Sequence, residues 1–360
     1  MNTSYTFIII PFLTTLALSL LSVPYVIRLC KKKELYDMPN SRKVHNFAVP
    51  RLGGIIFMPI TAIGMLVGMT IFNGGVNKEF NLYLSTILMV VGALLIYLIG
   101  LIDDLRGLRA IEKFAVQITA AMIFPSCHLM INNLNGLFGI YELPFWVSYF
   151  LTVFIILLIV NAMNLIDGID GLSSGLSILI LIAFTYLFNK LDTPLFVLLS
   201  ICLCGSIIGF FVYNYFGVIG KHKIFMGDTG SLFIGFVVAY LAIKYQMSSW
   251  PGFGYREGAF LTSFTLLFIP CIDVIRVALQ RLANRKGMFS PDKTHIHHLI
   301  MGMGFGMHQT LFTILLLYAI LCIINWGLFV CNTPQTWIIL LDVAIYSAFI
   351  WSTYKIGNTK

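Results

Sequence analysis

The sequence predicts an all-α, polytopic integral membrane protein. Its 360 residues are 59% hydrophobic and only 11% charged, and the mean hydropathy is +0.91. Soluble domains carry roughly 25% charged residues. The apolar residues also form long runs, and a helix crosses a bilayer with roughly 20 mostly apolar residues. Runs of that length favour helices over the shorter, alternating strands of membrane barrels.

Transmembrane helices account for most of the chain, and eleven are predicted in order. They are 5–29, 50–72, 82–102, 114–132, 144–162, 173–189, 194–216, 230–246, 259–280, 309–330 and 336–354. Segment 114–132 has a polar end, and segment 230–246 is short. The first span is predicted to be a retained anchor rather than a cleaved signal, because no basic residues precede it and no small-residue cleavage site follows.

The basic residues predict the orientation. Nineteen of the 23 lysines and arginines fall on alternate loops, in segments 28–51, 106–113, 221–223, 276–293 and 355–360. The remaining four are Lys78, Lys190, Lys244 and Arg256. Loops rich in Lys and Arg stay in the cytosol, which predicts an external N-terminus and a cytosolic C-terminus. Because the net charge of +8 follows this topology, it is no sign of a nucleic-acid partner.

Acidic residues gather on the predicted cytosolic side. Asp103, Asp104, Asp167, Asp170 and Asp228 each end or begin a span. A carboxylate in mid-bilayer costs roughly 2.5–3.5 kcal/mol on insertion scales, and less near the interface. Helix capping explains any one of these residues, but not an Asp–Asp pair at a helix end, where the dipole disfavours negative charge. The five together predict one shared acidic site, whose hard oxygen ligands suit Mg²⁺ or Mn²⁺.

Glycines accompany two of these acidic segments. "GIDGL" (168–172) and "MGDTGS" (226–231) let the backbone bend and approach a ligand closely. The second segment opens a helix, and free N–H groups at a helix start suit phosphate. We therefore expect the acidic site to bind a metal ion together with a phosphorylated substrate.

Histidines form a further polar cluster in "THIHHL" (294–299). Imidazoles beside basic residues are suited to holding phosphate oxygens, and a basic segment near position 45 is expected to join them. Structural zinc is the competing interpretation. It lacks an evident fourth ligand, because most cysteines lie inside predicted spans.

Four motifs together resemble the polyprenyl-phosphate N-acetylhexosamine-1-phosphate transferases, the WecA/TagO/MraY superfamily. They read "GLIDDLRGL" (100–108), "NAMNLIDGIDGL" (161–172), "HKIFMGDTGS" (222–231) and "DKTHIHHL" (292–299), and they occur in family order. The resemblance covers residues 20–310 of a single predicted transmembrane domain that spans the whole chain.

The resemblance implies an activity at the cytosolic face of a bacterial inner (plasma) membrane. A family member of the WecA/TagO branch transfers N-acetylglucosamine-1-phosphate from UDP-GlcNAc to undecaprenyl phosphate. The products are undecaprenyl-pyrophosphoryl-GlcNAc, which initiates a cell-envelope polysaccharide, and UMP. Mg²⁺ is required, and Mn²⁺ can replace it. The oligomeric state is left open, with a homodimer as one alternative.

Two alternative functions remain beside this one. The first is MraY-like transfer of phospho-MurNAc-pentapeptide, which "HNFAVPRLGG" (45–54) and the interrupted histidine motif disfavour. The second is a membrane transporter that uses the acids as an ion pathway. Transporters place such groups near the bilayer midplane, whereas these acids lie at one face.

The resemblance also implies roles for individual residues. The predicted catalytic residues are Asp103, Asp104, Lys113, Asp167, His297 and His298. The predicted substrate-binding residues are His45, Asn164, Asp170, Phe225, Arg285, Lys293 and His295. The predicted metal ligands are Asp167 and Asp228. Within these sets, Asp170 and Phe225 are expected to hold the uracil, and one of Asp103 and Asp104 to orient the lipid phosphate.

Overall fold

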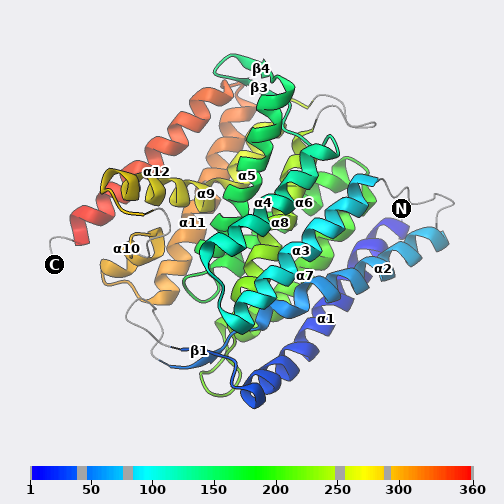
Figure 1. The fold of residues 1–360 in the computed structure, drawn as a ribbon. Coiled ribbons are helices and arrows are strands. Elements are labelled where there is room, and N and C mark those ends of the chain that lie inside the picture. Colours follow the sequence, from blue (N-terminus) through cyan, green and yellow to red (C-terminus); the bar gives the residue numbers. More distant parts are fainter. Residues whose placement is uncertain (1, 39–46, 76–83, 248–255, 288–292, 358–360) are drawn as a thin grey trace.

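The computed structural model of the protein describes residues 2–38, 47–75, 84–247, 256–287 and 293–357 (Figure 1). Within these residues the chain is predominantly helical, and ten helices are long and apolar enough to cross a membrane. The prediction of an all-α, polytopic membrane protein is therefore confirmed.

The helices follow the predicted order, with shifts of a few residues at their ends. Their bounds are α1 (Asn2–Lys33), η1 (Gly53–Ile56), α2 (Phe57–Gly75), α3 (Leu84–Arg106), α4 (Ala110–Ser126), α5 (Phe145–Leu165), α6 (Leu172–Lys190), α7 (Pro194–Tyr215), α8 (Gly227–Gln246), α9 (Ala259–Ala283), α10 (Ile296–Gly302), α11 (Met307–Val330) and α12 (Gln335–Gly357).

The predicted span 114–132 requires a correction. It corresponds to α4, which begins four residues earlier, ends at Ser126 and has only 17 residues. A spanning helix needs roughly 17–25 residues, so α4 is at the lower limit and is not among the ten. Its first turn is polar, because Glu112 and Lys113 belong to the site end of the bundle rather than to its apolar middle.

Two short antiparallel hairpins, which the sequence did not predict, lie at opposite ends of the bundle (Figure 1). Their strands are β1 (Tyr36–Asp37), β2 (Val49–Pro50), β3 (Asn133–Leu137) and β4 (Ile140–Glu142). Tyr36 pairs with Pro50 in the first hairpin, and Leu137 pairs with Ile140 in the second. The first hairpin follows α1 and lies at the end that carries the acidic residues.

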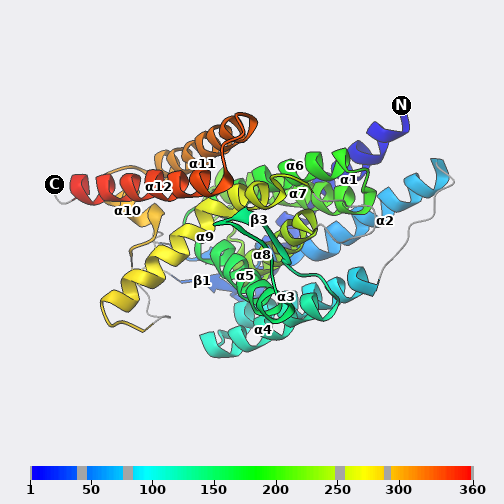
Figure 2. The same ribbon diagram turned by 90° about the horizontal axis from the view of Figure 1, so that it is seen from above.

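Helix α8 forms the centre of the bundle, and every residue from Thr229 to Lys244 is buried. Figure 2 shows it between α3, α4 and α5 on one side and α6 and α7 on the other. A Cβ on Gly100 of α3 would lie 2.7 Å from Cα of Thr229, and one on Gly235 would lie 2.8 Å from Cα of Val160 in α5. Small residues allow such close helix packing in membranes. The start of α8 is therefore fixed against α3 and α5.

Backbone hydrogen bonds tie the loop before α8 to the segment before α2. The Phe225 N–H donates to the Pro50 carbonyl at 2.7 Å, and the Gly53 N–H donates to the Phe225 carbonyl at 2.9 Å. The Gly54 N–H donates to the Met226 carbonyl at 2.7 Å. These bonds bring two segments that lie far apart in the sequence to the same end of the bundle.

Candidate active site

A cavity of about 540 Å³ lies at the end of the bundle where α3 ends and α8 begins. Small-molecule pockets commonly measure roughly 300–1,000 Å³, so the cavity suits a ligand of nucleotide-sugar size. The predicted site residues in its lining are Asp103, Asp104, Asn164, Asp167, Asp170, Phe225, Asp228 and His298. The structure thus brings together side chains from four of the sequence segments singled out above.

Asp228 reaches the cavity from the first turn of α8. Gly227 precedes it with φ +75°, a left-handed conformation that favours glycine, and so allows the sharp turn into the helix. Oδ2 of Asp228 lies 2.7 Å from Nζ of Lys113, which α4 supplies. At the end of α5, Asn164 donates to the hydroxyl of Ser231 on α8 at 2.8 Å. Three helices therefore fix the surroundings of this carboxylate.

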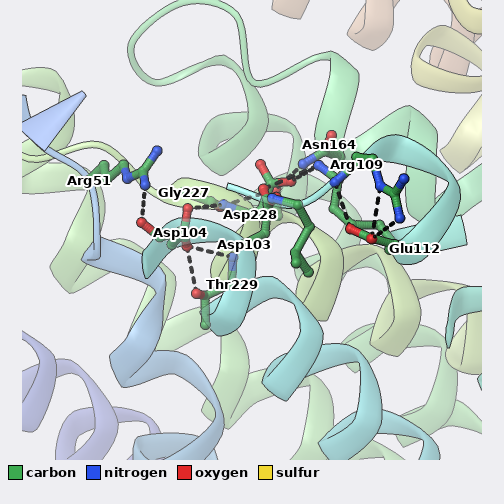
Figure 3. Close-up of polar contacts among 12 residues, drawn as sticks. Arg51, Asp103, Asp104, Arg109, Glu112, Asn164, Gly227, Asp228 and Thr229 are labelled. Carbon is green, nitrogen blue, oxygen red and sulfur yellow. Dashed lines mark hydrogen bonds and ion pairs between the residues drawn. The ribbon is translucent and has the colours of Figure 1, made fainter. Parts of the chain in front are cut away.

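Asp104 is occupied by hydrogen bonds within the protein. Its carboxylate accepts from the backbone N–H of Asp228 at 3.0 Å, and from the N–H and hydroxyl of Thr229 at 2.9 and 2.6 Å. The Arg51 guanidinium donates to its backbone carbonyl, and only 3% of the residue is exposed. Figure 3 shows the Asp104 carboxylate beside Gly227 and Thr229. Asp104 therefore holds the first turn of α8, with little capacity left for a substrate.

Asp103 has different partners from its neighbour. Its Oδ2 lies 3.2 Å from Nζ of Lys113, and its Oδ1 accepts from the Leu108 N–H at 2.7 Å. Lys113 consequently bridges Asp103 and Asp228. Of the two adjacent aspartates, Asp103 is the one that belongs to the charged network in the cavity.

The loop between α5 and α6 adds two more carboxylates. Burial, together with the nearby negative charges of Asp170, Asp228 and Asp104, raises the pKa of Asp167 to about 8. Acids that repel one another in this way are stabilised by a cation. The preference for a bound cation is a property of the cluster of aspartates as a whole and does not depend on any single one of them.

The donor set fits Mg²⁺ bound together with a substrate. Among the described residues, no group of three or more His, Cys, Asp or Glu side chains is arranged for metal binding. Mg²⁺ is usually held by one or two carboxylates and completes its shell with substrate phosphates and water. Asp167 and Asp228 line the same cavity, and a cation near them would offset the repulsion that raises the pKa of Asp167.

A buried ion pair closes another part of the cavity. Nζ of Lys223 lies 2.6 Å from Oδ2 of Asp170, and both side chains are less than a tenth exposed. Asn214 joins the two loops involved, because it accepts from the Gly171 N–H at 2.8 Å and donates to the Ile224 carbonyl at 3.0 Å. Sequence reasoning missed Asn214, although an asparagine within an apolar span is a signal of such a role. It also missed Arg51, which lines the cavity.

The three histidines do not form one phosphate-binding face. His298 lines the cavity. His297 is 2% exposed, and burial lowers its pKa to about 3, so it stays neutral near pH 7. His295 is buried beside Asp273, with Nδ1 2.7 Å from Oδ2 of that residue. The structure thus gives two of the imidazoles packing partners inside the protein, and neither His295 nor His297 belongs to the lining of the cavity.

The remaining predicted substrate-binding residues lie elsewhere. Arg285 and Lys293 are exposed and do not belong to the lining of the cavity. Arg285 follows the end of α9 with φ +53°. His45 lies outside the residues that the structure describes. A contribution of these three residues to the site stays a prediction.

The fold and site define an integral membrane protein whose cavity, at one end of the helix bundle, is lined by carboxylates suited to a metal ion and a phosphorylated substrate. Residues 86–246, which include Asp103, Asp104, Asp167 and Asp228, match a family model described as glycosyl transferase family 4. Helices α9 to α12 follow this matched region. The comparisons with individual proteins extend beyond it.

Similar proteins cover most of the chain. A Bacillus subtilis protein named "Probable undecaprenyl-phosphate N-acetylglucosaminyl 1-phosphate transferase" is 32% identical, over 95% of this chain and 90% of its own length. The Escherichia coli K12 undecaprenyl-phosphate alpha-N-acetylglucosaminyl 1-phosphate transferase is 31% identical, over 92% and 88%. A Mycobacterium leprae decaprenyl-phosphate N-acetylglucosaminephosphotransferase is 30% identical, over 83% and 77%. The chain belongs to the family of polyprenyl-phosphate N-acetylglucosamine-1-phosphate transferases.

Proposed function

We propose that the protein transfers N-acetylglucosamine-1-phosphate from UDP-GlcNAc to undecaprenyl phosphate, and that it does so at the cytosolic face of a bacterial inner membrane. The observation that carries this proposal is the convergence of Asp103, Asp167 and Asp228 on one cavity at an end of the bundle. A lipid phosphate and a soluble nucleotide sugar can meet only at such an interface. The names of the relatives support the acceptor and the sugar.

The proposed reaction exchanges one phosphoanhydride bond for another. An oxygen of the lipid phosphate attacks the β-phosphorus of UDP-GlcNAc, the bond from that phosphorus to the bridging oxygen breaks, and UMP leaves with the electron pair. A phosphate monoester has a second pKa near 6, so the nucleophile is already mostly dianionic at neutral pH. Catalysis then depends on positioning and on charge stabilisation rather than on a strong base.

The residues that line the cavity, together with Lys113 beside two of them, would have separate roles in this reaction. Asp167 and Asp228 would hold Mg²⁺, which neutralises pyrophosphate charge when bound. Lys113 lies against Asp228 and Asp103 and would stabilise phosphate oxygens there. Asp103 would orient the acceptor, while Asp104 keeps the start of α8 in place. The wall with Phe225 would contact the nucleobase by stacking.

The test is direct analysis of the product. Detergent-purified protein is supplied with undecaprenyl phosphate, Mg²⁺ and either UDP-GlcNAc or UDP-MurNAc-pentapeptide at equal concentration, and the lipid product is identified by mass spectrometry. We expect undecaprenyl-pyrophosphoryl-GlcNAc and UMP from the first donor only. Equal use of the pentapeptide donor would contradict the proposed specificity, and the absence of any lipid product would contradict the proposed activity.

The proposed orientation predicts a labelling pattern on intact cells. Single cysteines at Ser41 or Ser290 should be protected from a membrane-impermeant thiol reagent, whereas cysteines at Asn77 or Ser249 should react. All four positions lie outside the residues that the structure describes. The physical reason is the concentration of Lys and Arg on the segments that include positions 41 and 290. The opposite pattern would place the site on the outer face.

A further inference from the structure

Asp273 is a buried carboxylate on α9 that lies outside the lining of the cavity, and only 1% of it is exposed. Its Oδ1 accepts from the Ile296 N–H at 3.0 Å, from the Tyr346 hydroxyl at 2.9 Å and from Arg276 at 2.7 Å. Its Oδ2 lies 2.7 Å from Nδ1 of His295. One carboxylate thus joins α9, the start of α10 and α12.

The protonation of this cluster follows from its donors. An ionised carboxylate only accepts hydrogen bonds, and Asp273 receives one from the cation Arg276. The facing nitrogen of His295, Nδ1, must therefore carry the proton. Arg276 also donates to the Thr294 carbonyl at 2.5 Å, so both ends of the turn before α10 are fixed. Burying such a charge is costly unless every partner is in place.

Contacts at α10 link Asp273 to the active site. The rings of His295 and His297 are nearly parallel, with an interplanar angle of 5° and centroids 6.0 Å apart. His297 packs on Gly168 of the loop between α5 and α6, residues 166–171, called here the acidic loop; a Cβ on Gly168 would lie 2.2 Å from Nε2 of His297. The ring of His298, which lines the cavity, is 4.3 Å from that of His297. A shift of α10 would therefore move both the acidic loop and a wall of the cavity.

We propose that Asp273 is a positioning residue of the transferase, which acts through His295 to hold α10 and the acidic loop in their catalytic arrangement. This inference rests on the proposed function. Asp273 itself would touch no substrate. Its effect on the reaction would come from the placement of His297 against Gly168 and of His298 in the cavity wall.

The test replaces Asp273 with Asn and uses Asp342→Asn as the matched control. In Asp273→Asn the amide oxygen can still serve the three donors at Oδ1, but the NH₂ group then faces Nδ1 of His295, so the contact survives only if the ring carries its proton on Nε2, and the bond to a charged carboxylate is lost. Asp342 is also buried, on α12, and accepts from Asn325 at 2.7 Å. Its partner Asn325 belongs to α11 rather than to α10. The two variants therefore share the chemical change and the burial but differ in the link to the site.

We expect the kcat of Asp273→Asn, measured per folded molecule, to fall about 100-fold, the order that misplacement by an ångström can cause. Its KM for UDP-GlcNAc should stay within about threefold, because the uracil side of the cavity is untouched. Asp342→Asn should keep both constants within about threefold. His295→Ala should lower kcat by a similar factor. The double variant with Asp273→Asn and His295→Ala should have a kcat no lower than that of either single variant. Additive losses, or an active Asp273→Asn, would overturn the proposal.

Hydrogen exchange gives a readout that does not require turnover. Peptides covering 296–302 and 166–171 should exchange faster in Asp273→Asn than in wild type and in Asp342→Asn. Unchanged exchange in both peptides would overturn the positioning role of Asp273. Absence of activity with UDP-GlcNAc in the wild-type protein would instead count against the proposed function, and the exchange experiment would still test the positioning role. If Asp273→Asn does not fold, His295→Ala carries the same two expectations and the same refutation.

Discussion

Asp228→Asn is expected to lower the transfer rate by about 1,000-fold, the upper range for loss of one preorganised group that stabilises charge in the transition state. The carboxylate lies 2.7 Å from Nζ of Lys113 and lines the cavity next to the acidic loop. The amide keeps the shape of the side chain but removes a negative charge from the proposed metal site. The measurement is the rate of UMP release with saturating UDP-GlcNAc and undecaprenyl phosphate.

The structure supplies a control for this variant. Asp192→Asn changes an exposed aspartate in the turn between α6 and α7, with φ +50°, a conformation that asparagine tolerates. It should retain the wild-type rate. If Asp228→Asn kept more than about a tenth of the activity, the residue would not be the principal metal ligand.

Removal of the metal ion should have the same effect as this substitution. We expect excess EDTA to stop the wild-type reaction and Mg²⁺ or Mn²⁺ to restore it, because hard oxygen ligands suit both ions. Asp228→Asn should need a higher Mg²⁺ concentration for any residual rate. Undiminished turnover in EDTA would contradict the proposed cofactor.

Substitutions of the two adjacent aspartates, Asp103 and Asp104, are expected to have different effects on stability. Asp104→Asn should lower the melting temperature and abolish transfer together, because its amide NH₂ would face an N–H or O–H donor in the first turn of α8. A buried donor left without an acceptor costs about 1–3 kcal/mol. Asp103→Asn should abolish transfer with an unchanged melting temperature, since its oxygen can still accept from the Leu108 N–H.

A thermal-shift experiment in detergent, run beside the activity assay, separates these outcomes. Thr229→Val removes only the hydroxyl that donates to Asp104 at 2.6 Å and should cost about 1 kcal/mol, less than Asp104→Asn. If Asp104→Asn were as stable as wild type while Asp103→Asn unfolded early, the assignment of structural and catalytic roles to the pair would be reversed.

Much of the architecture could be predicted because membrane spans are a local property of the chain. A run of about 20 apolar residues is sufficient to indicate a helix, and ten such helices occur in the described part of the structure. The start of helix α4 was harder to predict, because Glu112 and Lys113 follow closely after its first residue, Ala110, and lie at the site end of the bundle. The two hairpins escaped prediction, since strands of two to five residues carry little periodic signal.

The sequence was sufficient to predict which aspartates form the candidate site, but not the separate role of each residue. The sequence indicates that Asp103, Asp104, Asp167 and Asp228 share one end of the bundle, and all four line the cavity. It could not assign the histidines, because the partner of His295 lies 22 residues earlier on another helix. Asn214 was missed for the same reason, as its partners belong to two separate loops.

The sequence by itself determined that this protein spans a membrane and that its acids and glycines gather at one end, because hydropathy and the order of the motifs are written along the chain. Only the tertiary structure decided that Asp104 holds α8 while Asp103 belongs to the charged network. Adjacent residues on a helix point in different directions, about 100° apart, so they meet different neighbours. The partner of Asp104, Thr229, lies 125 residues further along the chain, and only the packing of α3 against α8 brings the two together.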